Sequence, residues 1–245
     1  MTGAPIDAPA PAGEPAGASG RPDPAVEVAV VDYGAGNLVS VTHALELLGA
    51  RVRLARRPAD LAGAAGLVVP GVGASGPAMA RLRRMGMLTA LRDAVEGGAG
   101  YLGICLGMQL LFERSEEDGA RGLGWLAGPV RRIPDAPRLP HIGWNQVDAD
   151  RTPLFADIQA GTPFYFVHSY APVPADPRIV TGTTEHGGRF ASAVSSGRLH
   201  GVQFHPEKSG AAGLVLLRNF LRLAAEGRGV GAARDPMVAL GGRAV

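Results

Sequence analysis

The chain has 245 residues, 46% of them hydrophobic, and a formal net charge of +2 at pH 7. This composition allows a sizeable globular core, whereas so small a charge argues against nucleic acid as a partner. No run of about 18 apolar residues predicts a membrane-spanning helix. A lone cysteine excludes an internal disulfide framework, which favours the reducing cytoplasm.

The two ends of the chain differ in composition from its centre. Residues 1–25 are rich in Ala, Pro and Gly and lack the basic start and apolar core of a signal peptide, so we expect a disordered extension. Residues 227–245 are similar and are expected to be a disordered tail. The sequence therefore predicts one domain over residues 26–226.

The first half of this domain alternates between strands and helices. In chain order we expect a strand at 26–31, a helix at 38–48, strands at 51–55 and 66–69, helices at 77–85 and 88–95, a strand at 99–102 and a helix at 106–114. This alternation predicts an α/β fold with a mostly parallel central sheet flanked by helices.

The second half is richer in strands. They are expected at 128–133, 142–147, 164–170, 178–184, 191–195 and 198–204, followed by a closing helix at 213–225. We expect these strands to add antiparallel pairs to the fold.

The stretch Gly103-Ile104-Cys105-Leu106-Gly107 joins a predicted strand to a predicted helix. A nucleophile between two such glycines is typical of an elbow, a sharp turn that exposes the central side chain. The glycines allow close backbone approach, and the helix N-terminus places positive partial charge beside the sulfur, which stabilises a thiolate. Cys105 is therefore predicted to be a catalytic nucleophile. The alternative is a small buried apolar residue.

A cysteine nucleophile needs a base, and the base needs an orienting group. His205 ends a predicted strand and is followed by Pro206 and Glu207. A carboxylate at that offset can reach round the turn and hold the imidazole in one tautomer. We expect His205 to be the base and Glu207 to orient it. The alternative is a capped turn with a surface acid.

An acyl-transfer site also needs hydrogen-bond donors for an oxyanion. The glycines of Pro70-Gly71-Val72-Gly73 let a peptide N–H point at a substrate, and the N–H of Leu106 lies beside the nucleophile. Gly71, Val72 and Leu106 are therefore the predicted oxyanion-hole residues. Loops 32–37 and 70–73 and Cys105 each follow a parallel strand, so we expect all three on one rim of the sheet.

The glycine-rich turn at 32–37 could instead indicate a dinucleotide loop. It fails the full fingerprint, because Leu38 and Val39 stand where the third glycine belongs. Neither a cofactor nor a metal site is predicted.

Together these motifs resemble the class I glutamine amidotransferases, in which a Cys-His-Glu glutaminase passes ammonia to a synthase. Within that class the match is closer to the glutaminase subunits of imidazole glycerol phosphate synthase, an enzyme of histidine biosynthesis. The resemblance covers about residues 26–225, and the two tails are not part of it. It rests on the elbow and on the segments Asp32-Tyr33-Gly34-Ala35-Gly36-Asn37, Pro70-Gly71-Val72-Gly73, His141-Ile142-Gly143-Trp144-Asn145, 164–170 and His205-Pro206-Glu207-Lys208-Ser209.

The resemblance implies an α/β fold of the flavodoxin-like kind and a glutaminase reaction without a cofactor. Cys105 would form a γ-glutamyl thioester, His205 would move the protons, and Glu207 would orient His205. The residues implied to hold the amino-acid end of glutamine are Gln109, Ser169 and Tyr170.

The resemblance also implies a heterodimer with a (β/α)8-barrel cyclase, through which ammonia would travel. The residues implied to face this partner are Asn37, Trp144, Tyr165 and Lys208, the last being the only lysine in the chain. The complex would make imidazole glycerol phosphate and an aminoimidazole carboxamide ribotide, without nucleic acid or membrane.

Three alternatives remain at this point. The chain could serve another class I synthase, for pyridoxal phosphate, anthranilate or nucleotides, although the His-Pro-Glu-Lys-Ser and His-x-Gly-Trp-Asn segments disfavour it. It could be a non-catalytic interaction subunit of the same fold, which an intact Cys-His-Glu set disfavours. It could be a free-standing hydrolase of γ-glutamyl compounds, which would be fully active without a partner.

Overall fold

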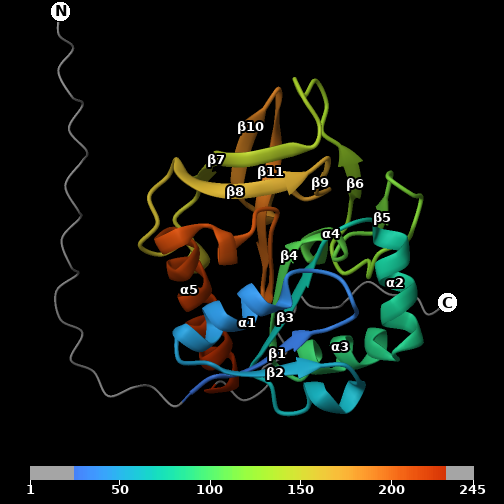
Figure 1. Cartoon of the computed structure of the whole chain (residues 1–245), viewed down its shortest axis with the longest axis vertical. Helices are drawn as coiled ribbons and strands as arrows, with labels where there is room; N and C mark the ends of the chain where they lie inside the picture. The colour runs from blue at the N-terminus through green and yellow to red at the C-terminus, as the bar shows by residue number, and fades with distance from the viewer. Residues whose placement is uncertain (1–24, 230–245) are drawn as a thin grey trace, which may run out of the picture.

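The computed structural model of the chain describes residues 25–229 (Figure 1). The expected extension up to residue 24 and the tail from residue 230 lie outside these described residues. The core is a nine-stranded sheet in the order β2-β1-β3-β4-β12-β11-β10-β7-β8. No helix between residues 25 and 229 is both long and apolar enough to cross a membrane.

One half of the large sheet is parallel and the other half is antiparallel. The parallel strands are β2 (Arg51–Ala55), β1 (Glu27–Val31), β3 (Gly66–Gly71), β4 (Gly100–Cys105) and β12 (Leu199–Val202). The antiparallel continuation is β11 (Gly188–Ser196), β10 (Val180–His186), β7 (His141–Ala149) and β8 (Thr162–His168). The predicted α/β class is confirmed, as a mixed sheet.

Helices cover both faces of the parallel half. In Figure 1, α1 (Leu38–Leu47) and α5 (Gly210–Gly229) lie on one side of the sheet, and α2 (Ser75–Arg84) and α3 (Met87–Glu96) lie on the other. The strands are apolar on both faces: in β1, Val28 and Val30 pack toward α1 and α5, whereas Ala29 and Val31 pack toward α2 and α3. Burial on both faces explains why these strands are continuous apolar runs rather than alternating ones.

A second, smaller sheet lies beside the large one. It contains β5 (Arg114–Ser115), β6 (Pro129–Arg132) and β9 (Tyr170–Pro172). The strand predicted at 164–170 is therefore wrong as a single element. It divides at Ser169 into β8 of the large sheet and β9 of the small one, because the Ser169 carbonyl accepts a hydrogen bond from the Ile133 N–H next to β6.

The helix predicted at 106–114 is also wrong in length. The helix α4 covers only Leu106–Gln109, and β5 begins at Arg114. The carbonyls of residues 110–112, which would continue the helix, instead accept hydrogen bonds from the backbone N–H groups of residues 123–126. A loop distant in sequence therefore ends α4 after about one turn.

The loops predicted to share a rim do so. β1, β3 and β4 are parallel neighbours, so the loops at 32–37 and 70–73 leave the sheet at the same edge as Cys105. The register places Gly71 directly opposite Cys105, and β12 lies on the other side of β4. The elbow is therefore flanked by the predicted oxyanion loop and by the strand that leads to His205.

The close packing of the elbow predicts that Gly103→Ala is strongly destabilising. A Cβ at Gly103 would meet the Gly107 carbonyl and lie 2.6 Å from the Met108 nitrogen, and backbone atoms of this turn cannot move aside. Overpacking of this kind costs about 3 kcal/mol. The free energy of unfolding from denaturant titration measures it.

Gly100→Ala is the matched control on the same strand. The nearest atoms to its Cβ would be those of Phe220 and Ala224, at 3.4 to 3.6 Å, which is ordinary contact. We expect it to change the free energy of unfolding by less than about 1 kcal/mol. Equal losses for the two variants would contradict the assignment of Gly103 to a close backbone approach.

Candidate active site

Cys105 ends β4 in a left-handed backbone conformation, with φ of 54° and ψ of −108°. A residue with a side chain rarely adopts this region, and holding it there costs on the order of 1–3 kcal/mol. The two glycines of the elbow permit it: a Cβ at Gly103 would strike Gly107, and a Cβ at Gly107 would strike the Val69 carbonyl on β3. The strained turn predicted from the pentapeptide is therefore present.

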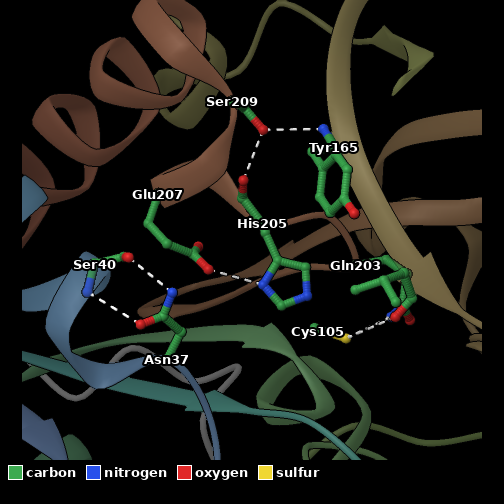
Figure 2. Close-up of polar contacts among 9 residues, drawn as sticks. Asn37, Ser40, Cys105, Tyr165, Gln203, His205, Glu207 and Ser209 are labelled. Carbon is green, nitrogen blue, oxygen red and sulfur yellow. Dashed lines mark hydrogen bonds and ion pairs between the residues drawn. The ribbon is translucent and has the colours of Figure 1, made fainter. Parts of the chain in front are cut away.

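His205 lies beside Cys105 and is oriented by Glu207, as Figure 2 shows. The imidazole Nδ1 lies 2.9 Å from Oε1 of Glu207, and both side chains are almost completely buried, with 4% and 1% of their surface exposed. The other ring nitrogen, Nε2, has no hydrogen-bond partner among residues 25–229 and lies on the side of the ring that faces Cys105 (Figure 2). This arrangement leaves Nε2 available for proton transfer at the sulfur.

The surroundings of His205 favour its charged form. Burial alone would lower its pKa, but the Cys105 side chain and the Glu207 carboxylate outweigh burial and raise the pKa of His205 to about 9. An almost fully buried carboxylate needs such a positive partner, because an unpaired charge in the protein interior is strongly destabilising.

The backbone of His205 is also held in place. Its N–H donates to the Tyr165 carbonyl on β8, at 2.8 Å, and its carbonyl accepts from the Ser209 hydroxyl, at 2.6 Å. The same hydroxyl oxygen accepts from the Tyr165 N–H at 3.0 Å (Figure 2). Through these two hydrogen bonds, Ser209 links the loop that carries His205 to β8 in the antiparallel half of the sheet.

Two groups besides His205 contact the Cys105 sulfur. The side-chain amide Nε2 of Gln203 donates to Sγ at 3.5 Å, and the thiol can donate to the Val167 carbonyl at 3.9 Å. Gln203 is completely buried. Sequence reasoning missed it, although an amide inside the apolar run Leu199-His200-Gly201-Val202-Gln203-Phe204 was a signal that could have found it.

The predicted glutamine-binding residues lie on the same side of the nucleophile. Gln109, on α4, donates its amide Nε2 to the Tyr170 carbonyl at 2.9 Å and to Oε1 of Gln203 at 3.1 Å. Ser169 is half-buried and precedes Tyr170 at the junction of β8 and β9. The structure thus brings Gln109 and Tyr170 into one hydrogen-bonded row that ends at the sulfur.

The predicted oxyanion residues flank the elbow on its other side. Gly71 is paired with Cys105 in the sheet, Leu106 begins α4, and Val72 stands at the open edge of the loop with 47% of its surface exposed. A side chain on Gly71 would collide with the Tyr33 hydroxyl, so the Tyr33 side chain would have to shift to admit one. The N–H groups of Val72 and Leu106 thus belong to the two segments nearest the nucleophile.

A row of histidines adjoins the site but stays neutral. His141 Nδ1 lies 3.1 Å from His168 Nε2, and His168 Nδ1 lies 2.9 Å from the Tyr170 carbonyl. Since a carbonyl only accepts, His168 carries its proton on Nδ1 and accepts from His141 at Nε2. Burial lowers the pKa of His168 to about 3, and burial with the neighbouring His186 lowers that of His141 to about 4.

Three of the predicted partner-facing residues gather on the surface beside His205. Trp144 on β7 is 58% exposed and meets Tyr165 edge-on, with ring centroids 6.2 Å apart. The Lys208 ammonium lies 5.7 Å from the centre of the Tyr165 ring, a cation–π contact. Asn37 is exposed at the start of α1, where its side chain caps the helix through Ser40.

The described residues contain no cluster of three or more His, Cys, Asp or Glu that could hold a metal ion.

Comparisons with known proteins agree with this geometry. The family described as glutamine amidotransferase class-I matches residues 29–224. Over 195 residues the chain is 51% identical to the imidazole glycerol phosphate synthase subunit HisH of Moorella thermoacetica, covering 79% of this chain and 93% of that protein. It is 48% identical to the same subunit of Synechococcus sp. strain JA-3-3Ab, covering 82% and 95%.

The chain belongs to the class-I glutamine amidotransferase family. Among these amidotransferases it groups with the HisH subunits of imidazole glycerol phosphate synthase, so the family predicted from the motifs is confirmed.

Solved structures support the amidotransferase fold. A crystal structure of a glutamine amidotransferase superposes with a TM-score of 0.64 at 25% identity, covering 81% of this chain and 98% of that one. PurLQS from Thermotoga maritima superposes with a TM-score of 0.66 at 20% identity, which bears on the fold alone.

The raised pKa of His205 predicts a distinctive titration for this amidotransferase. Its imidazole should titrate near pH 9, and Glu207→Gln should lower that midpoint because the carboxylate is lost. Because the pKa of His205 is higher in the folded chain than its usual value of 6.5, protonated His205 stabilises the fold. This stabilisation is complete below pH 6.5 and is lost as the pH rises through about 9. The stability advantage of wild type over Glu207→Gln should therefore shrink between those pH values.

Histidine ring signals in NMR and denaturant titrations at several pH values measure these effects. His168 and His200 serve as internal controls, because burial lowers their pKa to about 3 and about 4, so neither should titrate above pH 6.5. A His205 midpoint near 6.5 that is the same in Glu207→Gln would contradict the assignment.

Proposed function

We propose that the chain hydrolyses glutamine to glutamate and ammonia, with Cys105 as nucleophile, His205 as acid and base, and Glu207 as the orienting group. One observation carries the proposal: Cys105 stands on a strained elbow beside a buried His205–Glu207 pair whose free Nε2 faces the sulfur. The names of the relatives support the amidotransferase class.

The reaction follows from the positions of these groups. The Cys105 thiolate attacks the side-chain carboxamide carbon of glutamine, and the N–H groups of Val72 and Leu106 stabilise the resulting oxyanion. When the C–N bond breaks, protonated His205 gives its proton to the departing nitrogen, which leaves as ammonia. A water molecule then gives a proton to His205 and attacks the thioester, which releases glutamate and restores the thiolate.

We propose that the ammonia is delivered to a (β/α)8-barrel cyclase, bound at the surface formed by Trp144, Tyr165 and Lys208. The relatives are named as subunits of a synthase, which supports assembly with a second subunit. Ile142 and Trp144, 60% and 58% exposed, add apolar surface on the same strand. Exposed aromatic side chains beside a reactive site are typical of a protein interface. We place the complex in the cytoplasm and in histidine biosynthesis.

Two of the alternatives are disfavoured by specific observations. A non-catalytic subunit has no need of the strained Cys105 backbone or the buried ion pair. A free-standing hydrolase has no need of an exposed tryptophan beside the site. Service to another class I synthase is the nearest competing function, and the identity of the relatives as HisH subunits disfavours it.

Cys105→Ala is expected to abolish glutamine hydrolysis and to leave synthesis from added ammonia, because only the thiolate chemistry resides in this chain. The measurements are glutamate release and product formation with the cyclase present, and glutamate release without it. Turnover of glutamine near the wild-type rate would overturn the nucleophile. Full wild-type activity without the cyclase would favour the free-standing hydrolase.

Lys208 is expected to couple the two subunits. Lys208 is exposed and has no salt-bridge partner within residues 25–229. It lies three positions after the base His205, at the end of η4 (Pro206–Lys208). We expect Lys208→Ala to reduce the stimulation of glutamine hydrolysis by cyclase that carries its ligand about tenfold, the loss of roughly one good charged contact.

Lys208→Arg is the matched control, since it keeps the charge but replaces a compact ammonium with a wide planar fork. We expect it to bind the cyclase and to recover stimulation only in part. If both variants bind and are stimulated as well as wild type, Lys208 has no coupling role.

A further inference from the structure

The row of side chains that ends at the Cys105 sulfur has a defined direction. Gln109 Nε2 lies 2.9 Å from the Tyr170 carbonyl, which can only accept, so this end of the Gln109 amide must be the donor. The same nitrogen lies 3.1 Å from Gln203, which must therefore present its oxygen there. Gln203 is left with its N–H₂ group turned toward Sγ, at 3.5 Å (Figure 2).

This direction matters for the charge on the sulfur. A donor at 3.5 Å stabilises a thiolate, whereas the Val167 carbonyl, on the other contact, can accept only from the neutral thiol. Within the described residues, Gln203 is thus the side chain that donates a hydrogen bond to the nucleophile, whereas His205 Nε2 has no hydrogen-bond partner. Complete burial of Gln203 keeps water from competing for that bond.

The row also fixes where the sulfur lies. Gln203 directly follows β12, which is paired with β4 so that Val202 is opposite Ile104. The Gln203 N–H donates to the Ser192 carbonyl on β11 at 2.9 Å, which holds its backbone. Its side chain is held at the oxygen end by Gln109 and so cannot rotate away from the sulfur.

We propose that Gln203 is a positioning residue, which holds the Cys105 sulfur through its amide N–H₂ and stabilises the thiolate, and which is itself oriented by Gln109 and the Tyr170 carbonyl. The proposal deepens the glutaminase function proposed above and rests on it for its kinetic consequence. Its effect on the sulfur does not depend on glutamine and can be measured separately.

The test is the rate at which iodoacetamide alkylates Cys105 between pH 5 and pH 10. Gln203→Met has a similar volume but no donor. We expect the pH midpoint of its alkylation profile to rise by about one unit, with about a tenfold loss of alkylation rate at neutral pH, as for one lost hydrogen bond to a charged group. With glutamine, kcat should fall and KM should stay within about twofold.

Ser192→Ala is the matched control, because it removes another completely buried polar side chain beside Gln203, one whose hydroxyl makes no hydrogen bond to the sulfur. Its alkylation profile should overlay that of wild type.

Gln109→Met removes the group that orients Gln203, so it should move the midpoint of the alkylation profile in the same direction but by less. The double variant that combines Gln203→Met with Gln109→Met should have the same alkylation midpoint as Gln203→Met alone. Gln109→Met keeps the proposal testable if Gln203→Met does not fold.

Profiles of Gln203→Met and Gln109→Met that both overlay wild type would overturn the positioning role, whatever happens to turnover. The alkylation profiles of the variants could shift as expected while the wild-type chain hydrolyses no glutamine, with or without the cyclase. That result would overturn the proposed function and leave the role of Gln203 supported. The two failures are therefore distinguishable.

Discussion

The backbone conformation of Cys105 is the constraint on which the site depends. A left-handed residue with a side chain is strained, and it persists because β3, β4 and α4 leave the chain no other path. A side chain at Gly107 would strike β3, and one at Gly103 would strike the first turn of α4. The packing of β3, β4 and α4 around the elbow thus fixes the position of the Cys105 sulfur.

The base reaches that sulfur from the junction between the two halves of the large sheet. β12 is the last parallel strand and also the partner of the first antiparallel strand, so His205 follows the strand at which the sheet changes direction. Its backbone is bonded to Tyr165 on β8, whereas its side chain meets Cys105 from β4. The nucleophile depends on the parallel half, whereas the base depends on both halves, since it follows β12 and its backbone is bonded to β8. A partner at Trp144 and Tyr165 would contact the antiparallel strands that hold the base.

The features that the sequence predicts correctly depend on only a few neighbouring residues or on the pairing of parallel strands. The elbow, the His-Pro-Glu offset and the shared rim follow from glycine conformations, a short covalent path and parallel pairing, each readable over a few residues. The helix predicted at 106–114 and the single strand predicted at 164–170 are wrong, because hydrogen bonds from residues 123–126 and from Ile133 decide where α4 and β8 end. Gln203 was missed for the same kind of reason: its neighbour across the sheet exists only once β12 pairs with β4.

The division at Ser169 has a consequence for the chemistry. The Ser169 carbonyl bonds to Ile133, and the next carbonyl, that of Tyr170, is left to accept two side-chain donors, Gln109 and His168. One acceptor therefore fixes both rows: it sets the direction of the amides that end at the sulfur and the tautomer of the histidines beside it. Because the histidine row stays neutral, the imidazolium of His205 is the one cationic histidine that these contacts favour, and it lies where the thiolate needs it. The change of sheet at Ser169 thus places the neutral histidines His141 and His168 beside the charged pair of His205 and Glu207.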